Sequence, residues 1–459
     1  MSIQSLDLVG EPFAVIESDP GVFTTLIRKL GVQGLEVTEL YSVEPYETDH
    51  LNPYGLIFCY LCDGESNAAD DLPADEELDD PDARSIWFAN QLSDDACASL
   101  AILNVLLNCK RIELGPVLTD FAADTNEMSP VMRGLAVSNL TLVREAQNSL
   151  ARPADIRGAR QALASAALES AKSKAKAAAA SPPSKKRKTA SSSSRSKRKA
   201  ASARADDKLD AYHYIGYVPA HGRVWELNGL RAAGPLDVGE IDSDDPTSRA
   251  GWMDIVRPAL QRRMQTVLQS GAEHIQYNLL AIVDDPYFRA SDELEMLKRE
   301  RTALERRLRE SFADGWSDKV DSALLASASE AFATTLRPRA QETGKVFAPD
   351  FGARKMAKEL AILEMPERKL VPAWENCVRA ALSAKVAVEE EIEKSRRAQA
   401  DHVRRTFDYE PFIREFVIAL ENEGLLDDVL EERSATGKDA ATQPRPGPPS
   451  KARAKSRRK

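Results

Sequence analysis

The sequence predicts an α+β fold that is followed by an all-α extension. Strand-like runs and helical patterns are interspersed through the first 285 of its 459 residues. Two of the runs, 212–218 and 223–227, are separated by the turn AHG and predict a β-hairpin. Beyond Asp285 every recognisable pattern is helical. The length and a hydrophobic content of 43% are sufficient for two or three domains.

The elements of the first part follow from these patterns in order. The segment SDPGVFTTLIRKLG predicts a capped helix, with Pro20 in its first turn and Gly31 near its end. The run 96–108 is so apolar that its helix must be buried. The other expected strands are 13–16, 35–43, 55–61 and 275–283, and the other expected helices are 128–151 and 251–270.

The patterns after Asp285 indicate a helical arm. Leu294, Leu297, Leu304 and Leu308 recur at heptad-like spacing, which is too short a repeat to predict a coiled coil. A long amphipathic helix is expected over 373–405, and a further apolar stripe covers 412–430. We therefore expect helices that pack on a partner or on the body of the protein.

Two basic, low-complexity segments stand out from an otherwise acidic chain. Residues 152–205 contain 15 Lys and Arg against two acids, and 434–459 contain eight against one, although the net charge is −10. We expect the insert 152–207 and the tail 434–459 to be disordered. The clusters KKRK and RSKRK match basic import signals and favour the nucleus, while nucleosome or DNA contact and a solvated linker are the alternatives.

Other features exclude several classes of protein. No apolar run approaches the ~18 residues of a membrane span, and the N-terminus lacks the pattern of a secretory signal. Five cysteines in 459 residues indicate a reducing compartment. Cys59 and Cys62 form a CxxC without a second pair or a nearby histidine, so we expect two strand thiols, no metal and no cofactor. His50, His221, His274 and His402 have no catalytic context.

Four residues form a pattern that thiol-based acyl transfer requires. Gln91 precedes Cys97 by six residues where the apolar helix begins, and His213 precedes Asn228 by fifteen. A helix N-terminus and an imidazolium lower the pKa of a thiol towards neutrality. The histidine serves as base and proton donor, a third residue orients it, and an amide N–H stabilises the oxyanion.

The text around these residues resembles the ubiquitin C-terminal hydrolase family (UCH, peptidase C12). The matching segments keep the family's order over about residues 10–285 and include IWFANQ, DACASLAILNVLLNC, HYIGYVPAHGRVWELNGL and YNLLAIVDD. The resemblance implies a papain-like UCH fold, in which helices flank an antiparallel sheet and a crossover loop, here 152–207, passes over the active site. It assigns Cys97 as nucleophile, His213 as general base, Asn228 as its orienting partner and Gln91 as oxyanion donor.

Two departures from the family pattern bear on activity. Asn228 stands where the family has the Asp of ELDG, and Asp95 stands where an Asn usually precedes the cysteine by two. A neutral amide stabilises an imidazolium less than a carboxylate does, and its NH₂ could turn to the ring and favour the wrong tautomer. An inward Asp95 would raise the pKa of the thiol. An active enzyme and an impaired ubiquitin-binding scaffold therefore both stay open.

Residues 408–432 resemble the C-terminal helical domain of a subgroup of this family. One branch of the subgroup binds the proteasome's ubiquitin receptor and a chromatin remodeller, and the other binds a Polycomb-associated partner and acts on histone. The segment LYSVEP favours the proteasome branch. The predicted domains are a catalytic domain (1–285), a helical linker (286–370), a partner-binding domain (371–433) and a tail (434–459).

The resemblance thus implies a cysteine deubiquitinase that hydrolyses the bond after the C-terminal glycine of ubiquitin. Its implied partners are ubiquitin conjugates and a proteasome or chromatin subunit bound through 371–433, with no membrane. Together with the basic clusters, this predicts a location in nucleus and cytoplasm.

Overall fold

The computed structural model describes residues 11–62, 81–179, 211–242, 251–269, 277–312, 315–333 and 347–426. The chain divides into two compact units, Met1–Thr406 and Phe407–Lys459. The basic clusters of the insert and the tail 434–459 lie outside the described residues.

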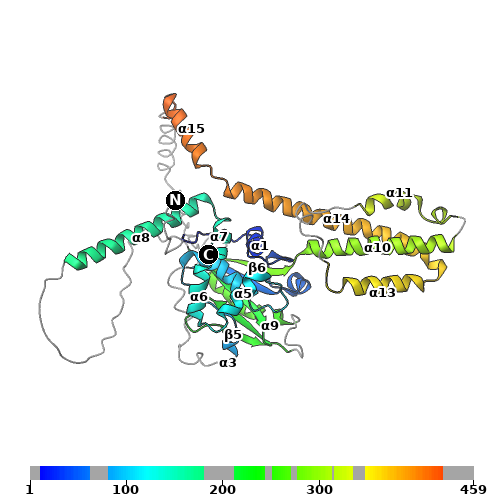
Figure 1. Cartoon of the computed structure of the whole chain (residues 1–459), viewed down its shortest axis with the longest axis horizontal. Helices are drawn as coiled ribbons and strands as arrows, with labels where there is room; N and C mark the ends of the chain where they lie inside the picture. The colour runs from blue at the N-terminus through cyan, green and yellow to red at the C-terminus, as the bar shows by residue number, and fades with distance from the viewer. Residues whose placement is uncertain are drawn as a thin grey trace, which may run out of the picture. The chain divides into compact units, whose positions relative to one another are not determined.

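The first unit is built on a six-stranded sheet with the order β1-β6-β2-β3-β4-β5. Figure 1 shows helices around this sheet. All neighbouring strands are antiparallel, and a β-bulge lies between Val224 and Trp225. The strands are β1 Leu35–Leu40, β2 Gly55–Cys62, β3 Ala211–Ala220, β4 Arg223–Asn228, β5 Leu236–Glu240 and β6 Tyr277–Asp284. The predicted hairpin is confirmed, because β3 and β4 pair with each other in antiparallel register. Its turn residues His221 and Gly222 both have positive φ.

Helices precede, separate and follow the strands. Those before Asp285 are α1 Pro20–Lys29, α2 Pro45–Thr48, α3 Pro81–Arg84, α4 Cys97–Leu106, α5 Gly115–Thr125, α6 Pro130–Asn139, α7 Thr141–Asn148, α8 Pro153–Ala179 and α9 Trp252–Gln269, with the 3₁₀ turns η1 Asp49–Leu51 and η3 Asp94–Ala96. Those that follow are α10 Pro286–Ser311, η4 Ser317–Lys319, α11 Ser322–Ala331, α13 Phe351–Leu363, α14 Glu367–Thr406 and, in the second unit, α15 Glu410–Asn422.

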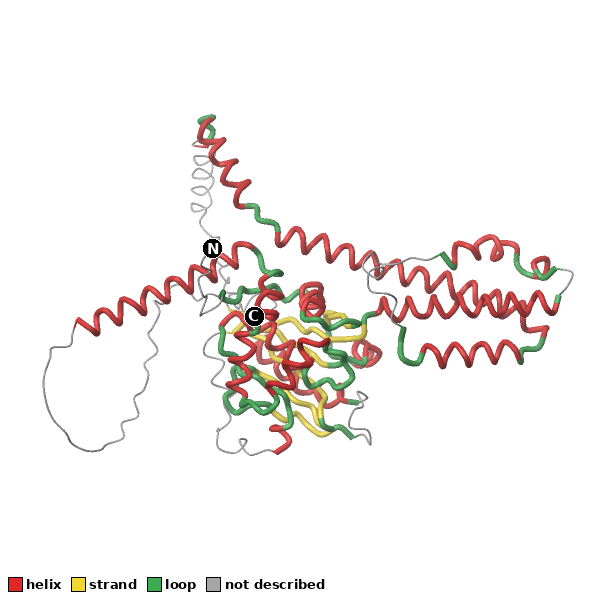
Figure 2. The backbone as a smooth tube through the Cα atoms, viewed as in Figure 1, coloured by secondary structure: helices red, strands yellow, loops and turns green. Residues whose placement is uncertain are grey.

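The two faces of the sheet bury separate cores because side chains alternate along each strand. Ile57 and Cys59 of β2 pack in the core that includes the apolar helix α4, whereas Phe58 and Tyr60 pack with α9 on the other face. Helices therefore flank an antiparallel sheet, as Figure 2 shows, and the predicted α+β class is confirmed.

The helices after Asp285 pack on one another within the first unit (Figure 2). The heptad-spaced leucines of α10 are buried against α14, on which Trp374 is fully buried. The later part of α14 contacts the part of the first unit that precedes Asp285, where Lys394 pairs with Glu36 and Arg405 Nε lies 2.9 Å from Glu17 Oε2. The expected domain border at 370/371 falls inside α14, so the arm is continuous there.

Several sequence expectations differ from the structure. The helix expected over 128–151 is two helices, α6 and α7, because the backbone of Leu140 between them is extended. Residues 13–16 form no strand, and the segment is held by side-chain amides of α7 instead. The edge strand β5 was not expected, since LDVGE has no apolar run. Pro153–Ala179 of the basic insert form the helix α8, because alanine has the highest intrinsic helix propensity.

Among the described helices, none combines the length and the apolar character needed to cross a membrane.

Candidate active site

His213 and Asn228 are brought together by the β3–β4 hairpin. Asn228 pairs with Ile215 in the register, two residues from His213, so both side chains lie on the sheet face that is covered by α9. His213 Nε2 lies 2.8 Å from Asn228 Oδ1, and the two residues are only 4% and 7% exposed. The edge of the imidazole also meets the Tyr60 ring at 5.8 Å between centroids.

A backbone hydrogen bond fixes the orientation of the Asn228 amide. The Leu230 N–H donates to Asn228 Oδ1 at 3.0 Å, so this atom is the carbonyl oxygen, an acceptor only. Nε2 of His213 must then donate, and the neutral imidazole carries its lone pair on Nδ1. The sequence left open whether the amide would turn its NH₂ to the ring, and the Leu230 contact opposes that rotamer.

Cys97 begins α4 directly after the turn η3, at the level where β3 starts. Its half-buried thiol donates to the Tyr212 carbonyl oxygen at 3.9 Å, and Tyr212 directly precedes His213. Within the described part of the chain, no hydrogen bond joins Cys97 to His213. The thiol is therefore close to His213 but is not hydrogen-bonded to it. Catalytic hydrogen bonds in free enzymes are often long and shorten only when substrate binds.

The electrostatics favour a neutral thiol and a neutral imidazole. Burial, then the neighbouring Cys59, raises the pKa of Cys97 to about 12, and the Ala98 backbone N–H at the helix start offsets only part of this. Burial also lowers the pKa of His213, although the hydrogen bond that His213 donates to Asn228 acts in the opposite direction. The expected lowering of the thiol pKa is therefore wrong for this geometry, because desolvation exceeds the effect of the helix N-terminus.

Gln91 is tied to the residue after Asn228. Its backbone N–H donates to the Gly229 carbonyl at 2.8 Å, and the Asn90 side chain donates to the same oxygen. A Cβ on Gly229 would lie 3.3 Å from the Gln91 Cβ and 2.7 Å from a methyl of Leu100. The glycine of ELNG thus permits a close approach of the Gln91 loop to β4, which supports Gln91 as a component of the site.

A buried ion pair that the sequence did not reveal supports the β3–β4 hairpin. Glu226, two residues before Asn228 on the same strand face, pairs with Arg263 of α9 and accepts from the Tyr217 hydroxyl at 2.9 Å. Glu226 is 4% exposed. The positive Arg263 contributes to the lowered pKa of His213. The only sequence signal was a charged residue between the apolar Trp225 and Leu227 of the strand.

Cys59 lies in the strand β2, as expected, with its side chain buried. Burial raises the pKa of its thiol to about 12, which makes it unreactive. Within the described ranges, no group of three or more His, Cys, Asp or Glu side chains is arranged to hold a metal ion.

We expect Asp95→Asn to increase the reactivity of Cys97. The Asp95 carboxylate adds to the raised thiol pKa, although less than burial and Cys59 do. Its removal should speed alkylation of Cys97 by iodoacetamide at pH 8 roughly threefold, since a nearby negative charge disfavours the thiolate. Cys97→Ala in the same assay gives the background from other thiols. An unchanged or slower rate would contradict this role of Asp95.

Comparisons with known proteins identify the family. The family model of ubiquitin carboxyl-terminal hydrolase, family 1, matches residues 13–265, more than half of the chain. A second model, ubiquitin carboxyl-terminal hydrolases, matches residues 382–426, which include the end of α14 and all of α15. The second match agrees with the resemblance of residues 408–432 to the C-terminal helical domain of a subgroup of this family.

Individual relatives agree with the family models. The chain is 32% identical over 315 residues to ubiquitin carboxyl-terminal hydrolase isozyme L5 of Dictyostelium discoideum, covering 68% of this chain and 74% of that protein. It is 28% identical to ubiquitin carboxyl-terminal hydrolase BAP1 of Gallus gallus, covering 63% of this chain and 36% of that longer protein. A crystal structure of Trichinella spiralis UCH37 bound to ubiquitin vinyl methyl ester is similar with a TM-score of 0.41 and 25% identity, covering 62% of this chain and 87% of that one.

The family match begins at Phe13, where the described core starts, and includes the helix α4 with Cys97 and the complete β3–β4 hairpin. The chain therefore belongs to ubiquitin carboxyl-terminal hydrolase family 1 and is a thiol-dependent ubiquitin hydrolase.

Proposed function

We propose that this enzyme cleaves the bond after the C-terminal glycine of ubiquitin through a thioester formed on Cys97. The observation that carries the assignment of roles is the Leu230–Asn228–His213 chain of hydrogen bonds. It leaves the lone pair of Nδ1 as the proton acceptor of a neutral imidazole. A thiol with a raised pKa needs such a base, because it holds almost no thiolate of its own at pH 7.

The residues act in a fixed order in this mechanism. His213 Nδ1 takes the thiol proton as Cys97 Sγ attacks the glycine carbonyl carbon. The resulting oxyanion is stabilised by the Cys97 backbone N–H and the Gln91 side-chain amide. Collapse of the tetrahedral intermediate breaks the C–N bond, and the imidazolium protonates the leaving amine. A water molecule, deprotonated by His213, then hydrolyses the thioester and frees the thiol.

Hydrolysis of a fluorogenic ubiquitin C-terminal amide tests this function. We expect turnover by the wild type and none above background for Cys97→Ala. Cys109→Ala is the matched control, because Cys109 is also a half-buried thiol and lies just beyond the other end of α4. Turnover that persists in Cys97→Ala, or that disappears in Cys109→Ala alone, would refute the assignment.

A second candidate is a ubiquitin-binding scaffold with little or no turnover. The neutral Asn228 and the burial of Cys97 favour it, because neither stabilises a thiolate–imidazolium pair. The same assay separates the two, since a scaffold would bind ubiquitin by calorimetry yet release no fluorophore. Recovery of turnover in Asn228→Asp would identify the amide as the cause.

Recruitment through the C-terminal helices is a further part of the proposal. α15 buries none of its residues within the described chain, and its apolar side chains are half or more exposed at Phe412, Ile413 and Phe416. Such a face is stabilised by covering it with a partner. The proteasome's ubiquitin receptor is the first candidate partner, and a chromatin-complex subunit is the alternative.

Phe416→Glu should abolish co-purification with that partner and leave hydrolysis of the fluorogenic ubiquitin amide by the purified enzyme unchanged. Glu415→Gln, a conservative change at the adjacent exposed position, is the control. If Phe416→Glu still co-purifies with the proteasome or chromatin subunit, α15 is not the recruiting surface.

The basic segments support a location in nucleus and cytoplasm. KKRK (185–188) and RSKRK (195–199) have the composition of import signals. Replacing all lysines and arginines of both clusters by glutamine should exclude a fluorescent fusion from the nucleus. Unchanged import together with lost DNA binding in a gel shift would instead assign the charge to nucleic-acid contact.

A further inference from the structure

Gln147 contacts the nucleophile turn, which comprises η3 and the first turn of α4 around Cys97, and its side chain is fully buried on α7. Its Nε2 donates to the Asp95 carbonyl oxygen at 2.6 Å and to the Ala14 carbonyl oxygen at 2.7 Å. Its Oε1 accepts from the Ser99 hydroxyl, also fully buried, at 2.6 Å. Gln147 thus contacts the residue two before Cys97 and the residue two after it.

This set of partners selects a carboxamide. Two backbone carbonyl oxygens need two N–H donors, and the hydroxyl needs an acceptor, which together match the polar atoms of glutamine. A glutamate would present acceptors to both carbonyls, and an apolar side chain would leave three buried polar groups without this partner. The polar surroundings of Cys97 therefore determine which residue fits at position 147.

These contacts affect the two groups of Cys97 that the mechanism uses, the thiol and the backbone N–H. The Asp95 carbonyl belongs to the turn η3, which leads into α4, and Ser99 lies in the first turn of α4. The orientation of this turn sets the direction of the Cys97 N–H and of the thiol. We propose that Gln147 is a positioning residue that clamps the nucleophile turn from both sides of Cys97, an inference that rests on the proposed acyl-enzyme function.

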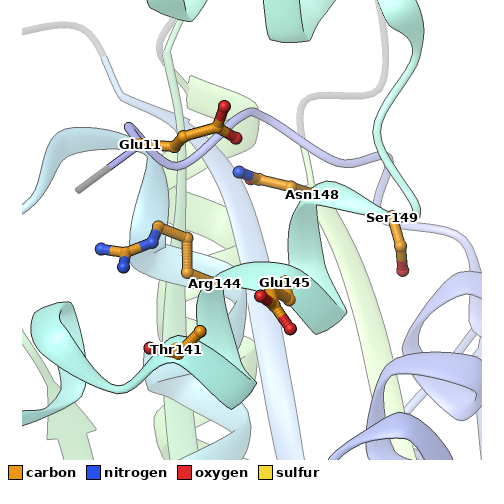
Figure 3. Close-up of a pocket in the computed structure, with 6 residues that line it drawn as sticks. All are labelled: Glu11, Thr141, Arg144, Glu145, Asn148 and Ser149. Atoms are coloured by element: carbon orange, nitrogen blue, oxygen red, sulfur yellow. The ribbon is translucent and has the colours of Figure 1, made fainter. Parts of the chain in front are cut away.

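Asn148, the next residue, provides a matched comparison. Its Oδ1 accepts from the Ala14 N–H at 2.9 Å, and its Nδ2 donates to the Pro12 carbonyl oxygen at 3.0 Å. Figure 3 shows Asn148 extending from the end of α7 on the side where the segment with Glu11 passes. The two amides therefore hold the same N-terminal segment, and Gln147 alone of the two also reaches the Cys97 turn.

The same end of α7 borders a surface pocket beside this N-terminal segment (Figure 3). The pocket is lined by Glu11, Thr141, Arg144, Glu145, Asn148 and Ser149. Neither Gln147 nor any of the four residues assigned to the chemistry lines it.

The test compares Gln147→Met with Asn148→Leu, because each change replaces a carboxamide by an apolar side chain of similar size. We expect Gln147→Met to lower kcat on the fluorogenic ubiquitin amide about 10- to 100-fold, with KM nearly unchanged, since small displacements of catalytic groups cost factors of this order. Asn148→Leu should keep kcat close to the wild-type value. Both are assayed well below their Tm values, which thermal unfolding provides.

Equal loss of kcat in the two variants, or wild-type kcat in Gln147→Met, would overturn the proposal. Alkylation of Cys97 by iodoacetamide over a range of pH is measured in parallel and needs no ubiquitin. Gln147→Met should slow alkylation and Asn148→Leu should not, even if the wild type hydrolyses no ubiquitin amide. If Gln147→Met does not fold, Ser99→Ala removes one of the three hydrogen bonds and should show a smaller loss of kcat, whereas no loss would overturn the clamp.

Discussion

Asn228→Asp is expected to raise kcat/KM for a ubiquitin C-terminal amide about 10- to 100-fold at pH 7. The reverse change costs about 10⁴ in a serine protease, and a thiol is more acidic than a hydroxyl, so the gain here should be smaller. The carboxylate would accept from His213 and from the Leu230 N–H as the amide oxygen does now. Among the described residues the Asn228 amide nitrogen has no recorded hydrogen bond, so the substitution breaks none.

The pH dependence shows whether this gain acts through His213. In the proposed mechanism, activity requires neutral His213, whose lowered pKa should place the acidic limb of the wild-type kcat/KM below pH 6.5. A carboxylate at 228 favours the imidazolium and raises that pKa, so the limb should move to higher pH. Asn228→Leu, which cannot accept from the ring, is the control and should lose most activity. A faster Asn228→Asp with an unshifted acidic limb would contradict the orienting role.

Arg263→Met should reduce the free energy of unfolding by about 3–5 kcal/mol, the cost of leaving a buried carboxylate without its partner. Glu226 is 4% exposed and receives two hydrogen bonds from Arg263 and one from Tyr217. Because Glu226 and Asn228 share one face of β4, activity should fall with stability. Urea unfolding at pH 7, followed by circular dichroism, measures the change.

Arg263→Met combined with Glu226→Gln is the matched control. The neutral amide removes the uncompensated charge, so the double variant should recover most of the stability that Arg263→Met loses. A double variant as unstable as the single one would show that Arg263 stabilises the fold through packing of its side chain on α9 and not through the charge of Glu226.

Local patterns were sufficient to predict the β3–β4 hairpin and the buried helix α4 that begins at Cys97. His213 and Asn228 lie fifteen residues apart on consecutive strands, so a short turn alone brings them close. The apolar run after Cys97 predicted a buried helix, and α4 is buried along its length apart from Cys97. The hydrogen bond between His213 and Asn228 agrees with the prediction that Asn228 orients the imidazole. The catalytic roles of the four residues stay predictions.

Features that depend on long-range contacts were not predictable in the same way. Gln147 lies with Val143 and Ala146 on the buried stripe of α7, and a polar residue on such a stripe is the only signal it gives. Its partners are 48 to 133 positions away in the sequence. The apolar segment at 13–16 suggested a strand, but among the described residues no strand pairs with it. Likewise, the pKa of Cys97 depends on burial, which helix position alone does not reveal.

Covalent trapping tests the central claim, a nucleophilic Cys97, most directly. The wild type and Cys97→Ala are incubated with ubiquitin that carries a C-terminal electrophile, and each is analysed by intact mass and by peptide mapping. The account predicts one ubiquitin adduct on the wild type, mapped to Cys97, and none on Cys97→Ala. An adduct on another cysteine, an adduct that persists in Cys97→Ala, or an unmodified wild type that binds ubiquitin would contradict it.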